Sequence, residues 1–330
     1  MKFVTYLHED VEQSGVVSGS RVFPIAGNPS VLDLVTSGLD SALHAGDSAL
    51  SMGKSVALER VSLRAPLQPP TVRDFVAFEE HVEGVRRSID GQAGVVEAWY
   101  EAPRFYFTNP YAIVGPDEQV RVPYGCAALD FELEVAAVIG RSGSGITVKE
   151  ATDHIFGYTI LNDWSARDLQ SREMQVNLGP SKGKDFATSI GPWLVTADEL
   201  DPYRDSEGFL DLECTVGVNG VEVGRDMLSN MGWTFETMTA YASRDTWVHP
   251  GDILGSGTVG NGGCLAELWG RNGERTPAPL RVGDRVVLSV DVLGTLANTV
   301  VAELPAPALP PVRRRDHAHA RARASLRAAR

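Results

Sequence analysis

The chain has 330 residues, of which 43% are hydrophobic, so it can bury a sizeable core and is not expected to be disordered as a whole. Its formal net charge of -13 argues against general nucleic-acid binding, because the phosphates would be repelled. No apolar run approaches the ~20 residues that span a bilayer, and the N-terminus lacks the pattern of a secretory signal, so we expect a cytoplasmic protein with no membrane partner.

Composition also bears on the fold class. The three cysteines, Cys126, Cys214 and Cys264, lie far apart and form no Cys-x-x-Cys pair, which favours buried thiols in a reducing compartment over a zinc site or a disulfide framework. The 33 glycines and 19 prolines indicate many turns. We therefore predict a strand-rich α+β fold rather than a helical bundle.

Residues 1–66 are predicted to form a small N-terminal β-rich module. One helix-like stretch, residues 31–43, lies among short segments with strand character. These strand candidates are residues 4–7, 14–25 and 55–63. The proline-rich segment 63–71 then marks a boundary.

Residues 67–305 are predicted to form the main domain. It opens with a helix candidate at residues 74–89, where apolar residues recur at three- and four-residue spacing. The strands and hairpins expected further along are residues 129–140, residues 155–163, a hairpin turning at Asn219 and Gly220, and a second hairpin over residues 283–304.

The remaining segment, residues 306–330, is made up mostly of proline, alanine and arginine. It has almost no large apolar residues and cannot bury enough surface to order itself, so we predict a disordered basic tail. An anion- or RNA-binding role is a weaker alternative to a solvated tail.

Two glutamates stand out in the strand candidate LDFELEVAAVIG. Glu132 and Glu134 are two residues apart, so on a strand their side chains project from the same face. Neighbouring carboxylates repel each other and must be solvated, have a raised pKa or be bridged by a cation. An exposed polar face on an ordinary strand is the simple alternative.

Two further segments carry polar residues in suggestive positions. Asp163 ends an apolar strand, and Arg167 and Gln170 follow at spacings that share one face if a helix begins there. Lys184 lies in a glycine-flanked loop, with Thr188 four residues later. The alternatives are a helix N-cap for Asp163 and a surface turn around Lys184.

Taken together, these segments resemble the fumarylacetoacetate hydrolase family. The motifs DFELEVA (130–136), GYTILNDWSARDLQ (157–170) and GKDFATSIGPW (183–193) occur in the family's order, and GDILGSGTVG (251–260) is similar to a later family stretch. The resemblance covers roughly residues 73–300. It implies that the main domain is a fumarylacetoacetase-like catalytic domain with a mixed β-roll.

The resemblance implies that Glu132, Glu134 and Asp163 bind a metal ion. All three ligands supply oxygen, which points to Mg²⁺, with Mn²⁺ or Ca²⁺ as substitutes. Zinc is disfavoured because none of the three is a histidine or cysteine.

The segment DFVAFEEH distinguishes branches of the family. Asp74 and His81 are seven residues apart, as in fumarylacetoacetases, where the aspartate is a further metal ligand and the histidine is the catalytic base. The alternative is that Asp74 caps a helix and His81 is exposed. Smaller members carry a glutamate three residues after the histidine, where this chain has Gly84. The resemblance instead nominates Glu267, on an expected late strand, as the partner that orients His81.

The activity implied is metal-dependent hydrolysis of a carbon–carbon bond in a small anionic diketo acid, a 1,3-diketone similar to fumarylacetoacetate or an acylpyruvate. In this reading a His81–Glu267 pair activates water. The residues implied to bind substrate, the first three also stabilising the oxyanion, are Arg167, Gln170, Lys184, Thr188 and Thr258. Val76 stands where fumarylacetoacetases have a substrate-contacting tyrosine, so a different diketo acid is as well supported.

Two other classes of function remain open from the sequence. The same metal site suits decarboxylation of a 2-oxo diacid or isomerisation of a hydroxymuconate-like dienol, and the chain could also be a non-catalytic metal-binding interaction module. Family resemblance also implies a homodimer. Clustered aromatic residues around Trp99 and Trp233 give this some support, although the same rings could fill the monomer core.

Overall fold

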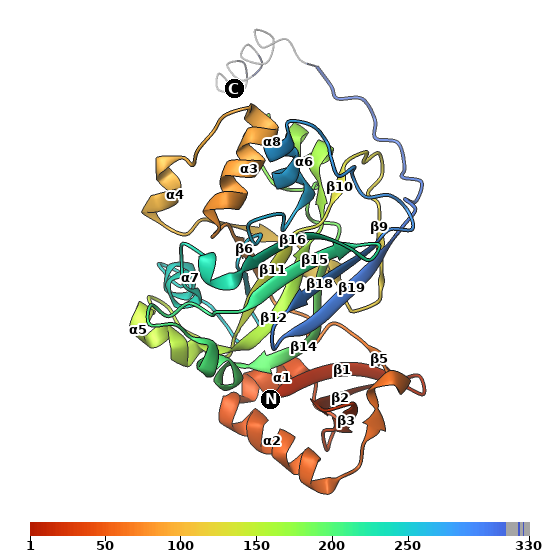
Figure 1. Cartoon of the computed structure of the whole chain (residues 1–330), viewed down its shortest axis with the longest axis vertical. Coiled ribbons are helices and arrows are strands. Elements are labelled where there is room, and N and C mark those ends of the chain that lie inside the picture. The colour runs from red at the N-terminus through yellow and green to blue at the C-terminus, as the bar shows by residue number, and fades with distance from the viewer. Residues whose placement is uncertain (315–322, 324–325, 327–330) are drawn as a thin grey trace.

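The computed structural model describes residues 1–314 and the single residues 323 and 326. This part of the chain has the predicted strand-rich α+β fold (Figure 1). Residues 302–314 form no helix or strand and are exposed, and most of the predicted basic tail lies outside the described residues. In the described part, no helix has both the length and the apolar character needed to cross a membrane.

The N-terminal strands form one end of a twelve-stranded sheet. They are β1 (Lys2–His8), β2 (Val11–Ser18), β3 (Arg21–Pro24), β4 (Val56–Ala57) and β5 (Ser62–Leu63). β1 pairs with β14 (Thr188–Thr196), so these strands extend the main sheet. The module boundary near residue 66 stays a prediction.

The helix predicted at residues 31–43 is in fact two helices, α1 (Val31–Ser37) and α2 (Leu39–Met52). Gly38 separates them with a φ of 89°. Side chains other than hydrogen rarely tolerate this region, so the first helix ends here and the chain restarts in a new direction.

The rest of the twelve-stranded sheet carries the central strands. Beyond β1 the order is β14, β12 (Ile155–Asp163), β11 (Leu133–Ile139), β17 (Ile253–Gly255), β6 (Val72–Phe75) and β7 (Phe105–Thr108). The short strand β8 (Ile113–Val114) pairs with β14. Every residue of β11 and β12 is buried.

Burial of β11 on both faces reflects two hydrophobic cores. Val135, Ala137 and Ile139 face one core, and Ala136 and Val138 face the other, as the alternation of a strand requires. Residues of α1 and α2 contribute to the second core. A five-stranded sheet contributes to the first.

The five-stranded sheet contains both predicted hairpins, which are confirmed. Its strands in spatial order are β16 (Val221–Met227), β15 (Glu213–Val218), β18 (Arg285–Val290), β19 (Gly294–Val301) and β9 (Gln119–Arg121). Asn219 and Gly220, both with positive φ, connect β15 to β16. A two-stranded sheet joins β10 (Leu129–Asp130) to β13 (Ser165–Ala166).

Helices lie around these sheets (Figure 1). The remaining α-helices are α3 (Glu79–Asp90), α4 (Glu97–Glu101), α5 (Val148–Ala151), α6 (Arg167–Met174), α7 (Phe235–Ala242) and α8 (Leu265–Asn272). Short 3-10 turns occupy Leu58–Arg60, Pro110–Ala112, Thr152–His154, Ala197–Tyr203 and Leu228–Asn230.

The prediction of a helix from residue 74 was wrong at its start. Residues Val72–Phe75 form β6, which pairs parallel to β17 and antiparallel to β7, and the helix α3 begins only at Glu79. Both flanking strands come from later in the chain, so long-range pairing overrode the local helical spacing. Asp74 is therefore on a strand, and Asp74 and His81 are not joined by two helical turns.

The prediction of a strand around Glu267 was also wrong, because this residue lies on α8. The helix packs closely against α3: a Cβ added at Gly270 would lie 1.9 Å from the carbonyl oxygen of Gly84. Cys264 begins α8 by accepting a hydrogen bond from the Glu267 amide. The close packing of α8 on α3 at Gly270 and Gly84 thus accounts for the helical conformation of this segment.

Candidate active site

A cavity of about 210 Å³ lies where β6, β7 and β11 meet α3 and α6. Most of the residues singled out from the sequence line it. They are Asp74, His81, Glu132, Glu134, Arg167, Gln170, Lys184 and Thr258. The fold thus brings together residues that lie up to 184 positions apart in the chain.

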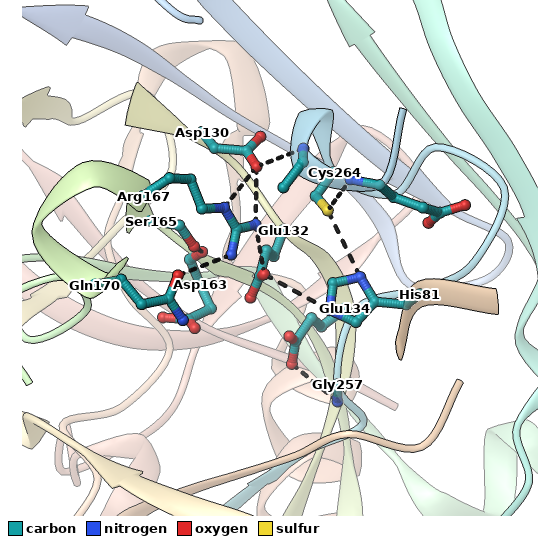
Figure 2. A network of polar contacts seen from close by, with 12 residues as sticks. His81, Asp130, Glu132, Glu134, Asp163, Ser165, Arg167, Gln170, Gly257 and Cys264 are labelled. Carbon is teal, nitrogen blue, oxygen red and sulfur yellow. Dashed lines mark hydrogen bonds and ion pairs between the residues drawn. The ribbon is translucent and has the colours of Figure 1, made fainter. Parts of the chain in front are cut away.

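Three carboxylates, those of Asp74, Glu132 and Glu134, line this cavity, and a fourth, that of Asp163, contacts Lys184 in its wall. Asp74 lies on β6, Glu134 on β11 and Asp163 at the end of β12, while Glu132 lies in the link between β10 and β11. All four are buried. Asp74, Glu132 and Glu134 each present an oxygen within 4.8 Å of the others. Figure 2 shows Glu132, Glu134 and Asp163 grouped below Arg167.

Burial raises the pKa of Asp74, Glu134 and Asp163, because the charged form is poorly solvated there. Nearby negative charges raise these pKa values further. Burial also opposes the ionisation of Glu132, but Lys184 and a neighbouring arginine outweigh it and lower the pKa of that carboxyl. The four carboxylates outnumber the two cations beside them, Lys184 and Arg167.

The donor set fits a hard divalent cation. Asp74 Oδ1, Glu134 Oε1 and Asp163 Oδ1 are buried and have no hydrogen-bond partner among the described residues. This arrangement is costly unless a proton or a cation satisfies the oxygens. Gly255 leaves room beside them, since a Cβ there would lie 2.8 Å from both Asp74 Oδ1 and Glu134 Oε2. Oxygen ligands of this kind suit Mg²⁺, Mn²⁺ or Ca²⁺.

Lys184 is the cation nearest to these carboxylates. Its Nζ lies 2.5 Å from Glu132 Oε2 and also contacts Asp163 Oδ2. Burial disfavours its charge, but Asp163 and Glu132 outweigh burial and raise the pKa of the ammonium. The Tyr106 hydroxyl donates to the same Asp163 oxygen. Sequence reasoning missed Tyr106 because it lies in an aromatic segment with no motif, opposite Asp74 on the neighbouring strand.

Arg167 begins α6, as expected, and its guanidinium has three side-chain partners. Nε donates to Asp130 Oδ2 at 2.9 Å, Nη2 to Glu132 Oε1 at 2.6 Å and Nη1 to Gln170 Oε1 at 3.2 Å (Figure 2). Gln170 follows on the same face of α6. The planar cation is therefore held in one orientation at the cavity wall.

Asp130 is a second residue that the sequence analysis did not assign. This fully buried carboxylate accepts hydrogen bonds from the Leu265 amide at 2.8 Å and the Ala266 amide at 3.0 Å, at the first turn of α8. It also pairs with Arg167. Its position as the first residue of the DFELEVA motif was the available signal. Asp130 links α8 to the cavity wall.

His81 lies on α3 with 7% of its surface exposed. Its Nε2 is 3.9 Å from Glu132 Oε1. Burial lowers the pKa of the imidazole to about 4, with Arg167 and Lys184 adding to the effect and Glu132 opposing it. His81 is therefore neutral near pH 7, the state a general base requires.

Nδ1 of His81 lies 3.6 Å from Cys264 Sγ (Figure 2). His81, Glu132 and Cys264 also bring one donor atom each within 4.8 Å of the others. Burial raises the pKa of Cys264 well above the usual value, so its sulfur is a thiol rather than the thiolate that binds metals. The carboxylate group is the better metal site.

Glu267 is not positioned as predicted. Its Oε1 accepts a hydrogen bond from the Gly262 amide at 3.2 Å and pairs with Arg271 at 2.7 Å. Burial raises the pKa of this carboxyl to about 7. His81 Nδ1 lies against Cys264, and the described part of the chain shows no hydrogen bond between His81 and Glu267.

The two predicted threonines differ in position. Thr258 lines the cavity. Thr188 does not: it is buried at the start of β14, where it is the cross-strand partner of Asp163. Thr258 lies in the segment that follows β17.

Comparison with known proteins places this chain in a family. Residues 71–301 match the family described as fumarylacetoacetate (FAA) hydrolase C-terminal. The chain is 30% identical to a fumarylacetoacetase of Arabidopsis thaliana over 70% of this chain and 67% of the relative. It is 34% identical to oxaloacetate tautomerase fahd2, mitochondrial, of Xenopus laevis over 79% of this chain and 76% of the relative. The chain belongs to the fumarylacetoacetate hydrolase family, as its motifs predicted.

Solved structures agree on the fold. A 2-hydroxyhepta-2,4-diene-1,7-dioate isomerase from Mycobacterium marinum is 26% identical, with a TM-score of 0.66 over 92% of this chain and 99% of that one. A maleylpyruvate hydrolase from Sphingobium sp. SYK-6, in complex with manganese (II) ion and pyruvate, is 22% identical, with a TM-score of 0.69 over 92% and 100%. The match spans only 57% of the fumarylacetoacetase of Dictyostelium discoideum. The relatives thus include hydrolases, a tautomerase and an isomerase.

Proposed function

We propose that this chain hydrolyses a carbon–carbon bond in a small acidic 1,3-diketone, of the fumarylacetoacetate or acylpyruvate kind. One observation carries the proposal. A buried neutral base, His81, and two cations, Arg167 and Lys184, line the same small cavity as a set of carboxylates that fits a divalent metal.

Asp74, Glu132, Glu134 and Asp163 would hold the metal, for which we propose Mg²⁺, with Mn²⁺ or Ca²⁺ as substitutes. When bound, it supplies positive charge that polarises a carbonyl group and stabilises an enolate. The structure of the maleylpyruvate hydrolase from Sphingobium, which contains manganese and pyruvate, supports a site of this kind.

Proton transfer falls to His81. Its Nε2 is on the cavity side, 3.9 Å from Glu132, while Nδ1 lies against Cys264. The neutral imidazole takes a proton from water, and the resulting hydroxide attacks a carbonyl carbon of the diketone. Glu267 is paired with Arg271 rather than with His81, so we propose that Cys264 is the contact that holds the ring in the state seen here.

Negative charge then develops on the attacked carbonyl oxygen. Lys184 and Arg167 are buried cations, and the Gln170 amide lies beside Arg167. Fixed donors in a water-poor cavity stabilise such an oxyanion strongly. When the tetrahedral adduct collapses, the carbonyl re-forms and the carbon–carbon bond breaks, leaving its electron pair on the departing carbon. His81 then gives that carbon the proton that it took from water. The products are a carboxylic acid and a shorter ketone.

The cavity limits the substrate. At about 210 Å³ it lies below the ~300–1,000 Å³ of pockets for drug-sized ligands, which favours a small acid. Val76 and Phe105 form apolar parts of the wall, and Thr258 offers a hydroxyl. We propose that Arg167, Gln170 and Thr258 contact the substrate, and we retain Thr188 only as a support behind Asp163.

Tautomerisation or isomerisation is the second candidate. The 34% identical relative from Xenopus laevis is named an oxaloacetate tautomerase, and the expected His81–Glu267 contact is replaced by Cys264. These reactions need proton transfer beside a metal but no attacking water. Decarboxylation of a 2-oxo diacid makes the same limited demand.

A substrate panel with product identification tests the proposal. The Mg²⁺-loaded protein is incubated with an acylpyruvate, fumarylacetoacetate, oxaloacetate and a hydroxymuconate-type dienol, and products are assigned by NMR. Formation of two shorter acids from a diketo acid is expected. If isomers are the only products, the second candidate is favoured. Release of carbon dioxide would indicate a decarboxylase. If no substrate reacts, a metal-binding interaction module is favoured.

A further inference from the structure

A second cavity, of about 520 Å³, lies between α3, α6 and α8. Figure 1 shows these three helices together at one end of the molecule. The cavity's charged lining residues are Arg87, Arg167, Arg271, Glu274 and Arg275. Four arginines around one cavity stand out in a chain whose net charge is -13, although three of them are paired with carboxylates.

The arginines differ in how far they are neutralised. Arg87 pairs with Glu83 at 2.8 Å, and both side chains are 42% exposed, so water screens this pair. Arg275 lies over the ring of Trp269 at 5.6 Å and has no ion pair within the described part of the chain. Of the four arginines, Arg275 is therefore the best placed to bind an external anion.

A buried carboxylate, that of Glu267, would compete with an external anion for the Arg271 guanidinium. Arg271 pairs with Glu267, whose side chain is fully buried, while the Arg271 side chain is 37% exposed and lines the cavity. Within residues 1–314, Glu267 Oε2 has no hydrogen-bond partner. An anion in the cavity would meet Arg271 from its exposed side and weaken its attraction for Glu267.

The cavity is next to the candidate active site but separate from it. Arg167 and Gln170 line both cavities, and they are joined by a hydrogen bond of 3.2 Å. Arg167 is already engaged by Asp130 and Glu132. Arg271 and Arg275 line only the larger cavity.

We propose that the cavity between α3, α6 and α8 is a binding site for a small anion, a carboxylate or an oxyanion such as phosphate, held by Arg275 and Arg271 in competition with Glu267. Arginine is suited to both chemistries because its planar fork donates two parallel hydrogen bonds. The site does not depend on the reaction proposed above.

Calorimetric titration of the full-length, Mg²⁺-loaded protein tests this directly. Succinate represents carboxylates, and sulfate represents oxyanions without precipitating the metal. Arg275→Gln should weaken binding of the preferred probe by about tenfold or more, as expected for losing a charge-assisted hydrogen bond. Glu267→Gln should tighten binding, because it removes the negative competitor for Arg271.

The matched control is Arg244→Gln. Arg244 also lies over an aromatic ring, that of Tyr241 at 5.3 Å, but it does not line the cavity. The Arg244→Gln substitution should leave anion binding unchanged. Melting curves will show which variants are folded. Binding of the same strength in Arg275→Gln, an equal loss in Arg244→Gln, or no binding of either probe to the unaltered protein would overturn the proposal. Because no turnover is measured, failure of the proposed hydrolase activity would leave this result standing.

Discussion

Gly84 and Glu267 share one space between α3 and α8. A Cβ added at Gly84 would lie 2.4 Å from Cγ of Glu267 and 3.1 Å from its Cα. The position at which smaller family members carry a glutamate is therefore filled from the other helix. The side chain of Glu267, on α8, therefore occupies the space that a side chain at residue 84 of α3 would need.

The Gly84 contact predicts an unusual response to alanine. In an exposed helix Gly→Ala stabilises by up to about 1 kcal/mol, but here the methyl group must displace Glu267, and overpacking costs about 1–3 kcal/mol. Gly84→Ala should thus lower the free energy of unfolding in urea. Ser88→Ala, an exposed change on the same helix, is the control. A Gly84→Ala protein more stable than the original would contradict the packing described.

The carboxylate cluster predicts that metal stabilises the fold. A ligand at one hundred times its Kd adds about 2.7 kcal/mol, so Mg²⁺ or Mn²⁺ should raise the Tm relative to protein in chelator. Glu134→Gln should abolish this rise. Its metal-free form should be at least as stable as the unaltered protein, because burial raises the pKa of Glu134 and a neutral amide avoids the cost of burying an ionisable group. Exposed Glu222→Gln should behave like the original. Equal Tm values with metal and with chelator would refute the site.

His81 should matter for turnover and not for metal binding. His81→Ala should lower kcat by a factor of about 100 or more, the usual contribution of a general base. Its metal-induced rise in Tm should persist, since the carboxylates are untouched. Normal hydrolysis by this variant would remove His81 from the mechanism.

The oligomeric state remains a proposal that light scattering can decide. Trp99 packs against Trp233 within the chain, so these rings are less available for an interface than the sequence indicated. Phe107 and Trp247 are exposed, at 60% and 57%. A homodimer should have about twice the chain mass of 35.6 kDa. A mass near 35.6 kDa at micromolar concentration would reject it.

The features that could be predicted from the sequence are mainly those that depend on residues close together in the chain. The turn at Asn219 and Gly220 depends on neighbours a few residues away, and this prediction is confirmed. Glu132 and Glu134 do meet at one site, but the strand predicted over residues 129–140 is interrupted, and Glu132 lies in the link before β11. Asp74 and Glu267 were assigned to the wrong kind of element. β6 exists because β17, roughly 180 residues later, pairs with it, and α8 follows from its packing on α3.

The same limit applies to the site. Cys264 was interpreted as an inert buried thiol, and nothing local indicated that it would lie against His81. Asp130 stood within a recognised motif, yet its bonds to the first turn of α8 join segments 135 residues apart. Contacts between distant segments are set by tertiary packing, which periodicity and spacing do not report.

Isotope labelling tests the central claim most directly. The Mg²⁺-loaded protein is incubated with the best diketo acid of the panel in water enriched in ¹⁸O, and the products are analysed by mass spectrometry. Hydrolysis predicts cleavage into two fragments, with one ¹⁸O in the newly formed carboxyl group. An uncleaved isomer, or a product formed by loss of carbon dioxide with no ¹⁸O in a new carboxyl group, would contradict carbon–carbon bond hydrolysis.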